Sequence, residues 1–336
     1  MTARTHVVFG TGPAGRAVAD ALLSQGTPVR MVNRSGTRAL TGVETIGGDA
    51  TDKAFAREVS ADAETVYFCL NAAHYHRWAQ EFPPLQEAVV EAAASARAKL
   101  VVLENLYMYG PTSEALHEAT PVNPTSAKSR TRAAMSADLL AAHQRGDLRV
   151  VIGRASDFIG PGVRDSAFGE FVFERALAGK RAQTMGRPDT LHTYSFVPDV
   201  GRNLVLLGSR DDADGRAWHL PNPVTRTTRQ LIMDVYTAAG TGRTDVTTLK
   251  RPMLQGLGLL NRNVRELVHT YYQFDAPFVV DDSAFREAFG GHTTSWSDII
   301  ASTIDWYRGL TATPRRPGAP VALTAIDARR VSSARL

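Results

Sequence analysis

The first 23 residues constrain the fold of this chain more than any other stretch. A short apolar strand pattern over 5–9 leads into Gly10, Gly12 and Gly15, and a pattern with apolar residues three and four apart follows. Strand, glycine turn and helix in G-x-G-x-x-G spacing begin a dinucleotide-binding unit. In such a turn Gly10 makes the tight bend, Gly12 lets backbone amides approach a pyrophosphate, and Gly15 lets the helix pack closely on the strand.

The start of the predicted helix favours an anion. Pro13 stands at the first helical position, where its missing N–H costs nothing, and Ala14 follows it. The helix N-terminus carries a partial positive charge and unpaired N–H groups. We therefore predict that the pyrophosphate is bound at 10–15.

A second strand pattern, over 28–32, ends in Asn33, Arg34 and Ser35. This is about 20 residues after the glycines, where an NAD-binding unit usually carries Asp or Glu for the ribose 2′-hydroxyl. No acid stands there. A guanidinium with neighbouring amide and hydroxyl groups suits a 2′-phosphate, so we expect NADP rather than NAD. The alternative is that Arg34 is a solvated loop residue.

Composition indicates an ordinary globular protein. The chain has 336 residues, 43% hydrophobic and 21% charged, and no apolar stretch approaches the roughly 20 residues of a membrane span. We expect a cytoplasmic protein. The single cysteine, Cys69, lies in an apolar run and is expected to be a buried hydrophobe. No C-x-x-C or H-E-x-x-H spacing predicts a metal site.

The net charge of +4 is located at the end of the chain. Residues 311–336 contain five arginines and one aspartate, which account for the whole excess, and three prolines interrupt them. Such a basic tail is more often a solvated arm than a nucleic-acid footprint. We therefore expect no nucleic-acid partner.

Strand and helix patterns alternate through residues 1–160. Strand patterns at 43–46, 65–70, 99–106 and 148–152 are separated by helical patterns at 53–59, 85–98 and 125–145. This alternation predicts an α/β protein with a doubly wound, parallel, Rossmann-type sheet and a ligand at the carboxyl ends of its strands. The pattern loosens after residue 160. We expect residues 161–310 to form mainly a smaller, mixed substrate-binding lobe, with some elements returning to the core.

The lobe has weaker patterns. Helices are predicted at 168–178, 200–207, 229–239, 281–289 and 296–307, and strands at 193–197, 217–220 and 245–249.

Four stretches together resemble a known family. They are the glycine turn at 10–15, the strand and turn at 101–110, the run at 154–162 that is similar to R-P-S-x-x-(Y/F)-G-P-G, and the segment at 196–200. The chain resembles the extended short-chain dehydrogenase/reductases of the NAD-dependent epimerase/dehydratase type, although these usually show G-x-x-G-x-x-G. The resemblance implies that Asp49 contacts adenine and that Leu70, Asn71 and Ala72 pass under the adenosine ribose.

The catalytic positions depart from the family. Its members use a Ser or Thr four residues before a Tyr-Gly and a Tyr-x-x-x-Lys on the next helix, where the Tyr transfers the proton. Here Asn105 replaces the Ser or Thr. Aligning Lys128 with the family Lys puts Pro124 in place of the Tyr, and aligning Arg130 there puts Ser126 in its place. Neither register contains a tyrosine.

Tyr107 is the substitute that the sequence favours. It lies two residues before Tyr109-Gly110, where the family's dehydratases carry a Glu that faces the substrate, and its alternative role is a packed aromatic. Leu106 and Tyr107 in place of that Asp-Glu pair argue against dehydration. Lys128 or Arg130 would hold the nicotinamide ribose. The segment 74–76, His-Tyr-His, either lines the site or lies on the surface.

These observations predict an NADP(H)-dependent oxidoreductase acting on a small organic carbonyl or alcohol, such as a sugar nucleotide or a natural-product intermediate. One alternative is an epimerase, isomerase or lyase that uses the cofactor transiently or not at all, and another is a non-catalytic NADP-binding regulator. The alanine-rich helices at 85–98 and 125–145 resemble the pair with which family members build a four-helix interface, so we also expect a homodimer.

Overall fold

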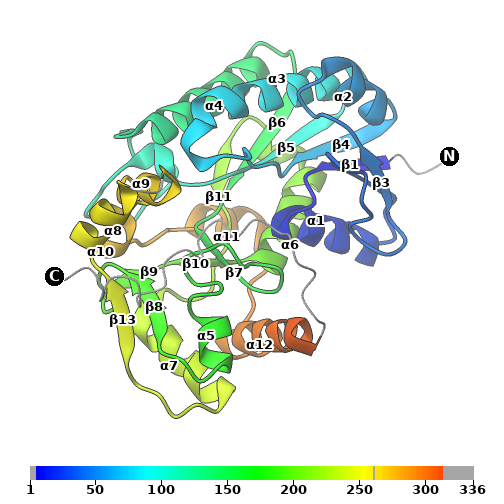
Figure 1. The fold of residues 1–336 in the computed structure, drawn as a ribbon. Coiled ribbons are helices and arrows are strands. Elements are labelled where there is room, and N and C mark those ends of the chain that lie inside the picture. The colour runs from blue at the N-terminus through cyan, green and yellow to red at the C-terminus, as the bar shows by residue number, and fades with distance from the viewer. Residues whose placement is uncertain (1–4, 260–261, 313–336) are drawn as a thin grey trace.

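A seven-stranded sheet organises the protein. The computed structural model describes residues 5–259 and 262–312 (Figure 1). All neighbouring strands of this sheet are parallel, in the order β11-β6-β5-β4-β1-β2-β3. The strands are β1 (Thr5–Phe9), β2 (Val29–Asn33), β3 (Glu44–Gly47), β4 (Ala63–Phe68), β5 (Lys99–Glu104), β6 (Arg149–Arg154) and β11 (Ala217–His219). The predicted Rossmann-type α/β class is confirmed.

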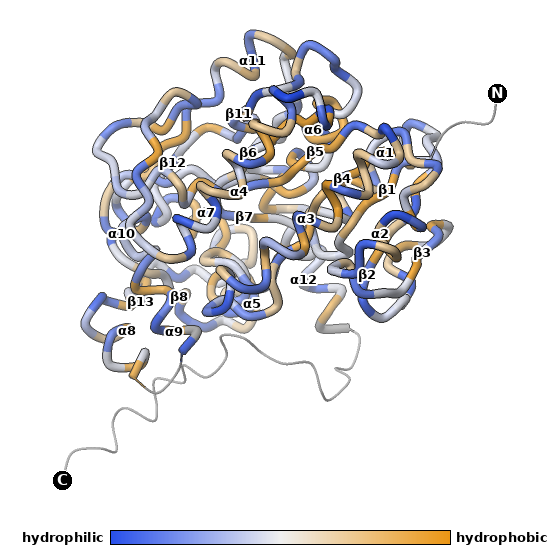
Figure 2. The backbone as a smooth tube through the Cα atoms, turned by 90° about the horizontal axis from the view of Figure 1, so that it is seen from above, coloured by the Kyte–Doolittle hydropathy of each residue, from blue (hydrophilic) through white to orange (hydrophobic). Residues whose placement is uncertain are grey.

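Helices cover both faces of the sheet, because successive strand residues point to opposite sides. Val7 and Phe9 face a core shared with α2 (Lys53–Ser60), α3 (Trp78–Ala96) and α4 (Ala127–Gln144). Val8 faces a second core shared with α1 (Pro13–Ser24), α6 (Val197–Ser209) and α11 (Ser283–Phe289). With both faces covered, the central strands are almost continuously apolar, as the orange segments at β1, β4 and β5 show (Figure 2).

The remaining elements form a smaller lobe. In Figure 1 its elements β8, β13, α5, α7 and α12 lie at the bottom, and α8, α9 and α10 lie at the left. Three two-stranded sheets pair β7 with β10, β8 with β13, and β9 with β12, and a third apolar core lies among α5, α7 and α12. The strands are β7 (Asp157–Ile159), β8 (Ala182–Met185), β9 (Leu191–His192), β10 (Tyr194–Phe196), β12 (Arg226–Thr227) and β13 (Val246–Leu249). The helices are α5 (Phe173–Leu177), α7 (Thr228–Ala239), α8 (Arg251–Gly258), α9 (Arg262–Val268), α10 (Tyr272–Asp275) and α12 (Trp296–Ala312).

Several predicted boundaries are wrong. The helix expected to start at residue 85 begins at Trp78 and contains Pro83 and Pro84, because the buried Trp78 and Phe82 anchor its first turns. The helix expected over 168–178 is only α5, since hydrogen bonds from Gly169 and Glu170 back to residues 166 and 164 hold the preceding chain in turns. The three helices α8, α9 and α10 were not predicted.

Two expectations remain predictions. Helices α3 and α4 lie side by side on one face of the sheet, so they are placed as the predicted homodimer requires, without testing it (Figure 1). Of the basic tail at 311–336, residues 313–336 lie outside the described residues.

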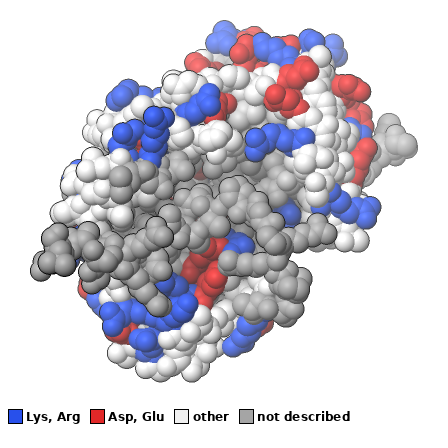
Figure 3. All heavy atoms as spheres, viewed as in Figure 1, with Lys and Arg blue, Asp and Glu red and all other residues white. Residues whose placement is uncertain are grey.

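Among the helices that the structure describes, none is long and apolar enough to cross a membrane. Basic and acidic side chains are interspersed on the visible face (Figure 3).

Helix α1 packs against α6 with backbone in contact. A Cβ atom added to Gly201 on α6 would lie 2.3 Å from the carbonyl carbon of Ala17 on α1, so no side chain fits there. The two helices therefore approach closely, and α1 is held between the sheet and α6.

We predict that Gly201→Ala lowers the free energy of unfolding by about 1–3 kcal/mol, because the added methyl group forces the helices apart. The measurement is urea unfolding followed by circular dichroism. Gly309→Ala is the matched control, since a Cβ there meets no atom within 4 Å and α12 gains helix propensity. Equal stability of the two variants would contradict the close approach of α1 and α6.

Candidate functional site

The glycine turn has the geometry that its spacing predicts. Gly10 has φ of +111°, and a Cβ there would lie 2.6 Å from the carbonyl oxygen of Cys69. A Cβ on Gly15 would lie 2.0 Å from the carbonyl oxygen of Gly10. These two positions therefore require glycine for the backbone's own packing.

Gly12 differs from the other two glycines, because it is exposed and a Cβ there would meet nothing within 4 Å. It is the N-cap of α1, no side chain caps that helix, and Pro13 and Ala14 form its first turn. The open space at Gly12 and the uncapped helix N-terminus together form a cradle that suits a phosphate group.

Asn33 ties the loop after β2 to this turn. Its Oδ1 accepts hydrogen bonds from the backbone N–H groups of Ser35 (3.0 Å) and Gly36 (2.7 Å). Its Nδ2 donates to the carbonyl of Thr37 (3.0 Å) and to the hydroxyl of Thr11 (3.4 Å). This order leaves the side chains of Arg34 and Ser35 exposed at the end of β2.

Asp49 lies on the same rim as Arg34. Its Oδ1 accepts hydrogen bonds from the backbone N–H (2.9 Å) and the hydroxyl (2.8 Å) of Thr51. These bonds lower the pKa of Asp49, and the charge of Arg34 contributes in the same direction, which places the guanidinium within electrostatic reach. Leu70 and the exposed Asn71 follow β4, and the buried Ala72 comes next. All predicted cofactor residues thus lie at the carboxyl ends of β1 to β4.

Tyr107 forms a pair with Tyr75, from the loop after β4. Their hydroxyl oxygens are 3.0 Å apart, and both rings contact the indole of Trp78. Burial raises the pKa of Tyr75 to about 12 and that of Tyr107 well above its ordinary value. Both hydroxyls are therefore protonated at neutral pH, and one of them donates its hydrogen to the other, so the pair keeps one hydrogen for a further bond. Asn105 accepts a hydrogen bond from the backbone N–H of Tyr107 (3.1 Å), so it shapes this turn.

Lys128 joins the tyrosine pair, whereas Arg130 is exposed on α4 and away from it. The Lys128 Nζ donates to the carbonyl of Glu266 (2.9 Å), lies 3.3 Å from its carboxylate, and stands 3.6 Å from the centre of the Tyr75 ring. Burial lowers the pKa of Lys128 to about 8, although Glu266 opposes this shift. The ammonium is thus held between Glu266 on α9 and the face of the Tyr75 ring.

A network of buried polar groups holds the turn that carries Tyr107. The Arg154 guanidinium, at the end of β6, donates to Glu104 (3.2 Å), to the hydroxyl of Tyr109 (2.6 Å) and to that of Ser136 (2.8 Å). The Tyr109 hydroxyl also lies 2.9 Å from Nε2 of His219. One guanidinium therefore links β5, the turn after it, β6 and α4.

The sequence analysis gave no role to three residues of the candidate site: Asp157, His192 and Tyr272. The carboxylate of Asp157 on β7 lies 2.8 Å from Nε2 of His192 on β9, and its charge adds to the burial that raises the pKa of Tyr272. Asp157 belongs to the run 154–162, but no role was predicted for it. His192 lies 35 positions further along the chain, and no local pattern joins the two. Tyr75 was noted as a residue that either lines the site or is exposed, and it lines the site.

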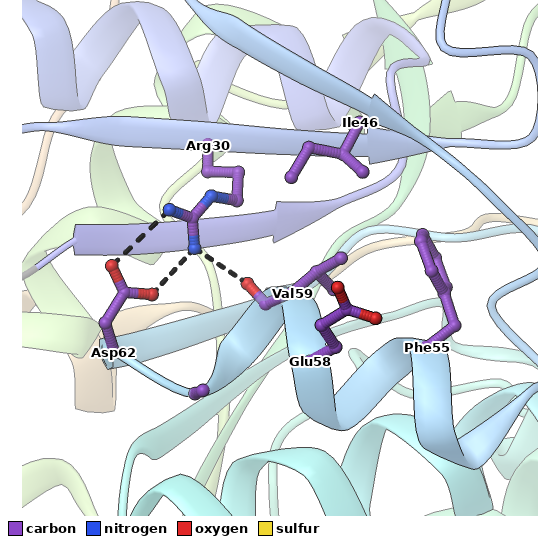
Figure 4. A pocket seen from close by; sticks show the side chains of 7 residues that line it. Arg30, Ile46, Phe55, Glu58, Val59 and Asp62 are labelled. Carbon is purple, nitrogen blue, oxygen red and sulfur yellow. Dashed lines mark hydrogen bonds and ion pairs between the residues drawn. The ribbon is translucent and has the colours of Figure 1, made fainter.

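Two surface hollows lie elsewhere. One is lined by Arg30, near the start of β2, and by Asp62, just before β4, so it is at the end of the sheet opposite to the glycine turn (Figure 4). The other lies on the lobe, around Asn222 and Trp296. Within residues 5–259 and 262–312, no group of three or more His, Cys, Asp or Glu side chains is arranged to hold a metal ion.

Solved structures share this fold. The dTDP-glucose 4,6-dehydratase of Bacillus anthracis, in complex with NAD, aligns with a TM-score of 0.75 and 15% identity over 91% of this chain and 97% of the other. The UDP-glucuronic acid 4-epimerase of Bacillus cereus, also with NAD, gives 0.73 and 16% over 91% and 99%. The UDP-glucose 4-epimerase of Thermotoga maritima, with UDP-glucose, gives 0.74 and 17% over 91% and 99%.

A search of curated proteins gives no match. A family model does match, over residues 7–220, and its description is the NAD dependent epimerase/dehydratase family. The matched region contains the glycine turn, the Tyr107 turn, the run 154–162 and the segment 196–200, which are the stretches that carried the resemblance. Because the match spans well over half of the chain, this protein belongs to the NAD dependent epimerase/dehydratase family.

Proposed function

We propose that this protein is an NADP(H)-dependent oxidoreductase that acts on a small organic carbonyl or alcohol, such as a sugar nucleotide or a natural-product intermediate. The observation that carries the proposal is the pairing of an open phosphate cradle at Gly12 with an exposed guanidinium, Arg34, at the end of the next strand. A dinucleotide placed along this rim meets a helix N-terminus at its pyrophosphate and a cation at its ribose.

The residues at the adenosine end fit a phosphorylated ribose. The side-chain oxygen of Asn33 already accepts two hydrogen bonds within its own loop. No carboxylate follows β2 to accept a hydrogen bond from a free 2′-hydroxyl. Arg34 and Ser35 are left to face the ligand. Two of the relatives named above, the dehydratase of Bacillus anthracis and the epimerase of Bacillus cereus, were solved with NAD, which supports a nicotinamide dinucleotide in general. The preference for NADP rests on Arg34.

The reacting end offers hydrogen-bond donors rather than an activated tyrosine. Bound nicotinamide would supply the hydride acceptor or donor. The chain would supply the Tyr75–Tyr107 pair, which is kept protonated and has one hydrogen to donate to an oxygen that gains negative charge during carbonyl reduction. Asn105 supports this pair by shaping the turn that carries Tyr107, and Lys128 supports it by packing over the Tyr75 ring.

A second candidate is an epimerase or isomerase that borrows the cofactor within each turnover. It is favoured by the names of the relatives, which include two sugar-nucleotide 4-epimerases. Both candidates use the same rim and the same hydride step, so they differ in whether the nicotinamide is consumed.

We predict that Arg34→Ala weakens NADPH binding by about 1.5–3 kcal/mol and leaves NADH binding nearly unchanged, because only NADPH presents a 2′-phosphate. Isothermal titration of both cofactors measures this difference. Arg38→Ala is the matched control, since Arg38 is an exposed arginine four positions along the same loop. Equal losses for the two cofactors, or a larger loss in the control, would show that Arg34 does not read the phosphate.

We predict that deuterium passes from C4-labelled NADPH to product when the protein is incubated with sugar nucleotides or with the small-molecule extract of the producing cell. Both C4 stereoisomers are used, and mass spectrometry detects the label. Unlabelled product without net NADPH consumption would favour the isomerase or a lyase. Tight NADPH binding without turnover would favour a regulator that only senses the cofactor.

A further inference from the structure

Asp157 and His192 form a carboxylate–imidazole pair between the sheet rim and the lobe. Asp157 starts β7, which pairs in parallel with β10, and β10 follows His192 after one residue. This pairing brings the carboxylate Oδ2 to 2.8 Å from Nε2 of His192. The other ring nitrogen, Nδ1, lies 3.1 Å from the carbonyl oxygen of Gln273.

Both nitrogens of this imidazole face hydrogen-bond acceptors. A carbonyl oxygen has only lone pairs, so Nδ1 must carry a proton to bond it. A carboxylate oxygen at 2.8 Å requires a second proton, on Nε2 or shared with the carboxylate. Hydrogen-bond accounting therefore places one proton on Nδ1 and a second between Nε2 and the Asp157 carboxyl. The pair is either an imidazolium that faces a carboxylate or a neutral imidazole that accepts from a protonated carboxyl.

The surroundings of His192 support the positive charge. The ring is 2% exposed and stacks on Phe274 with centres 5.0 Å apart, while Tyr194 and Phe278 lie at 4.5 and 5.3 Å. Aromatic faces stabilise a cation that has lost its water. The imidazolium in turn compensates the carboxylate, because an unpaired buried charge is costly.

Asp157 is the member of the pair that reaches the site. Its side chain is 21% exposed, so it keeps a route to solvent while Oδ2 is bonded to His192. Four tyrosines from four elements lie within its electrostatic reach. Burial raises the pKa of each, and the charge of Asp157 raises it further: Tyr75, Tyr107, Tyr194 and Tyr272.

The other groups near the tyrosine pair are poor proton acceptors at neutral pH. The tyrosines already hold their protons. The pKa of Lys128 is about 8, so its ammonium, which is bound to Glu266, stays mostly charged at pH 7. A family member without the Tyr-x-x-x-Lys relay still needs a group that accepts the alcohol proton. We propose that Asp157 is the general acid–base of this site, held ionised and oriented by His192, while the Tyr75–Tyr107 pair donates one hydrogen bond to the substrate oxygen. This assignment rests on the proposed oxidoreductase function.

In the oxidation direction, the substrate O–H bond breaks and its proton passes to the Asp157 carboxylate. The substrate C–H bond breaks as a C=O bond forms, and a bound, oxidised nicotinamide dinucleotide would accept the leaving electron pair as hydride. The alcohol is oxidised and the dinucleotide is reduced. Asp157 releases its proton to solvent, and in the reverse direction it returns a proton to the oxygen of the reduced carbonyl.

The first test is Asp157→Asn. Because positioned acid–base catalysis contributes typically 10²–10⁴-fold, we expect turnover to fall by about that factor while the Kd for NADPH is unchanged, and the acid limb of the pH–rate profile to disappear. Asp189→Asn, which removes an exposed lobe carboxylate paired with Arg229, should keep wild-type turnover and profile. Full turnover in Asp157→Asn would overturn the assignment.

The second test needs no substrate. In ¹⁵N spectra of the histidine rings at pH 7, both nitrogens of His192 should be protonated in the wild type, with His192→Gln identifying the resonances. Asp157→Asn should convert the ring to its neutral form, and the tyrosines of the site should then ionise at lower pH in an ultraviolet titration. A neutral His192 in the wild type would overturn the assignment even if the variants failed to fold.

Different results would contradict the oxidoreductase function and the acid–base role of Asp157. Wild-type protein that binds NADPH but transfers no deuterium overturns the oxidoreductase function, and the acid–base role with it, whatever the spectra show. Wild-type transfer together with a neutral His192, or with full turnover in Asp157→Asn, leaves the function standing and overturns only the role of Asp157.

Discussion

The contacts on which the site depends are those that helix α1 makes through its backbone. Gly15 rests on the carbonyl oxygen of Gly10 on one side of the helix, and Gly201 lies against Ala17 on the other. Neither contact leaves room for a Cβ atom, so the helix is fixed between the sheet and α6. Its uncapped N-terminus is thereby held at the carboxyl edge of the sheet, where the phosphate cradle is needed.

The same helix links the cofactor end of the site to its reacting end. A Cβ on Gly162 would lie 3.7 Å from the Cβ of Pro13, so the loop after β7 packs on the first turn of α1. Asp157 is at the other end of β7, and His192 reaches it from β9. The tyrosine pair is fixed separately, through the bonds of Arg154 to Glu104 and Tyr109 around the turn. The packing of the β7 loop on α1 and the hydrogen bonds of Arg154 are both attached to the sheet, and together they position the two parts of the candidate site.

The sequence predicted what is local and missed what depends on distant contacts. The strand patterns and the three glycine roles were read from spacings of a few residues, and the described residues have the expected arrangement. The sequence analysis placed the start of α3 too late, because a proline pair such as Pro83 and Pro84 usually marks the beginning or the end of a helix. The carbonyls of Ala79 and Gln80, which lose their helical partners, belong to exposed residues where water replaces those bonds. The buried aromatic side chains of that helix offset the remaining cost. Tyr272, Glu266 and His192 come from short elements with no periodic pattern, so the lobe's contribution to the site was not visible.

The electrostatics around Asp157 differ from those that the family's usual tyrosine requires. In the usual arrangement a lysine and the nicotinamide charge lower the tyrosine's pKa, so that its anion takes part in the reaction. Here the nearest lysine is bound to Glu266, and a carboxylate lies among the tyrosines and raises their pKa. An anion at Asp157 and a tyrosinate beside it would repel each other. A chain with Pro124 and Ser126 in the registers where the tyrosine belongs has no tyrosinate to protect, so it can place a fixed negative charge there. In the proposed site, that charge would also attract the positive ring of an oxidised nicotinamide, which would link cofactor binding to the proposed proton acceptor.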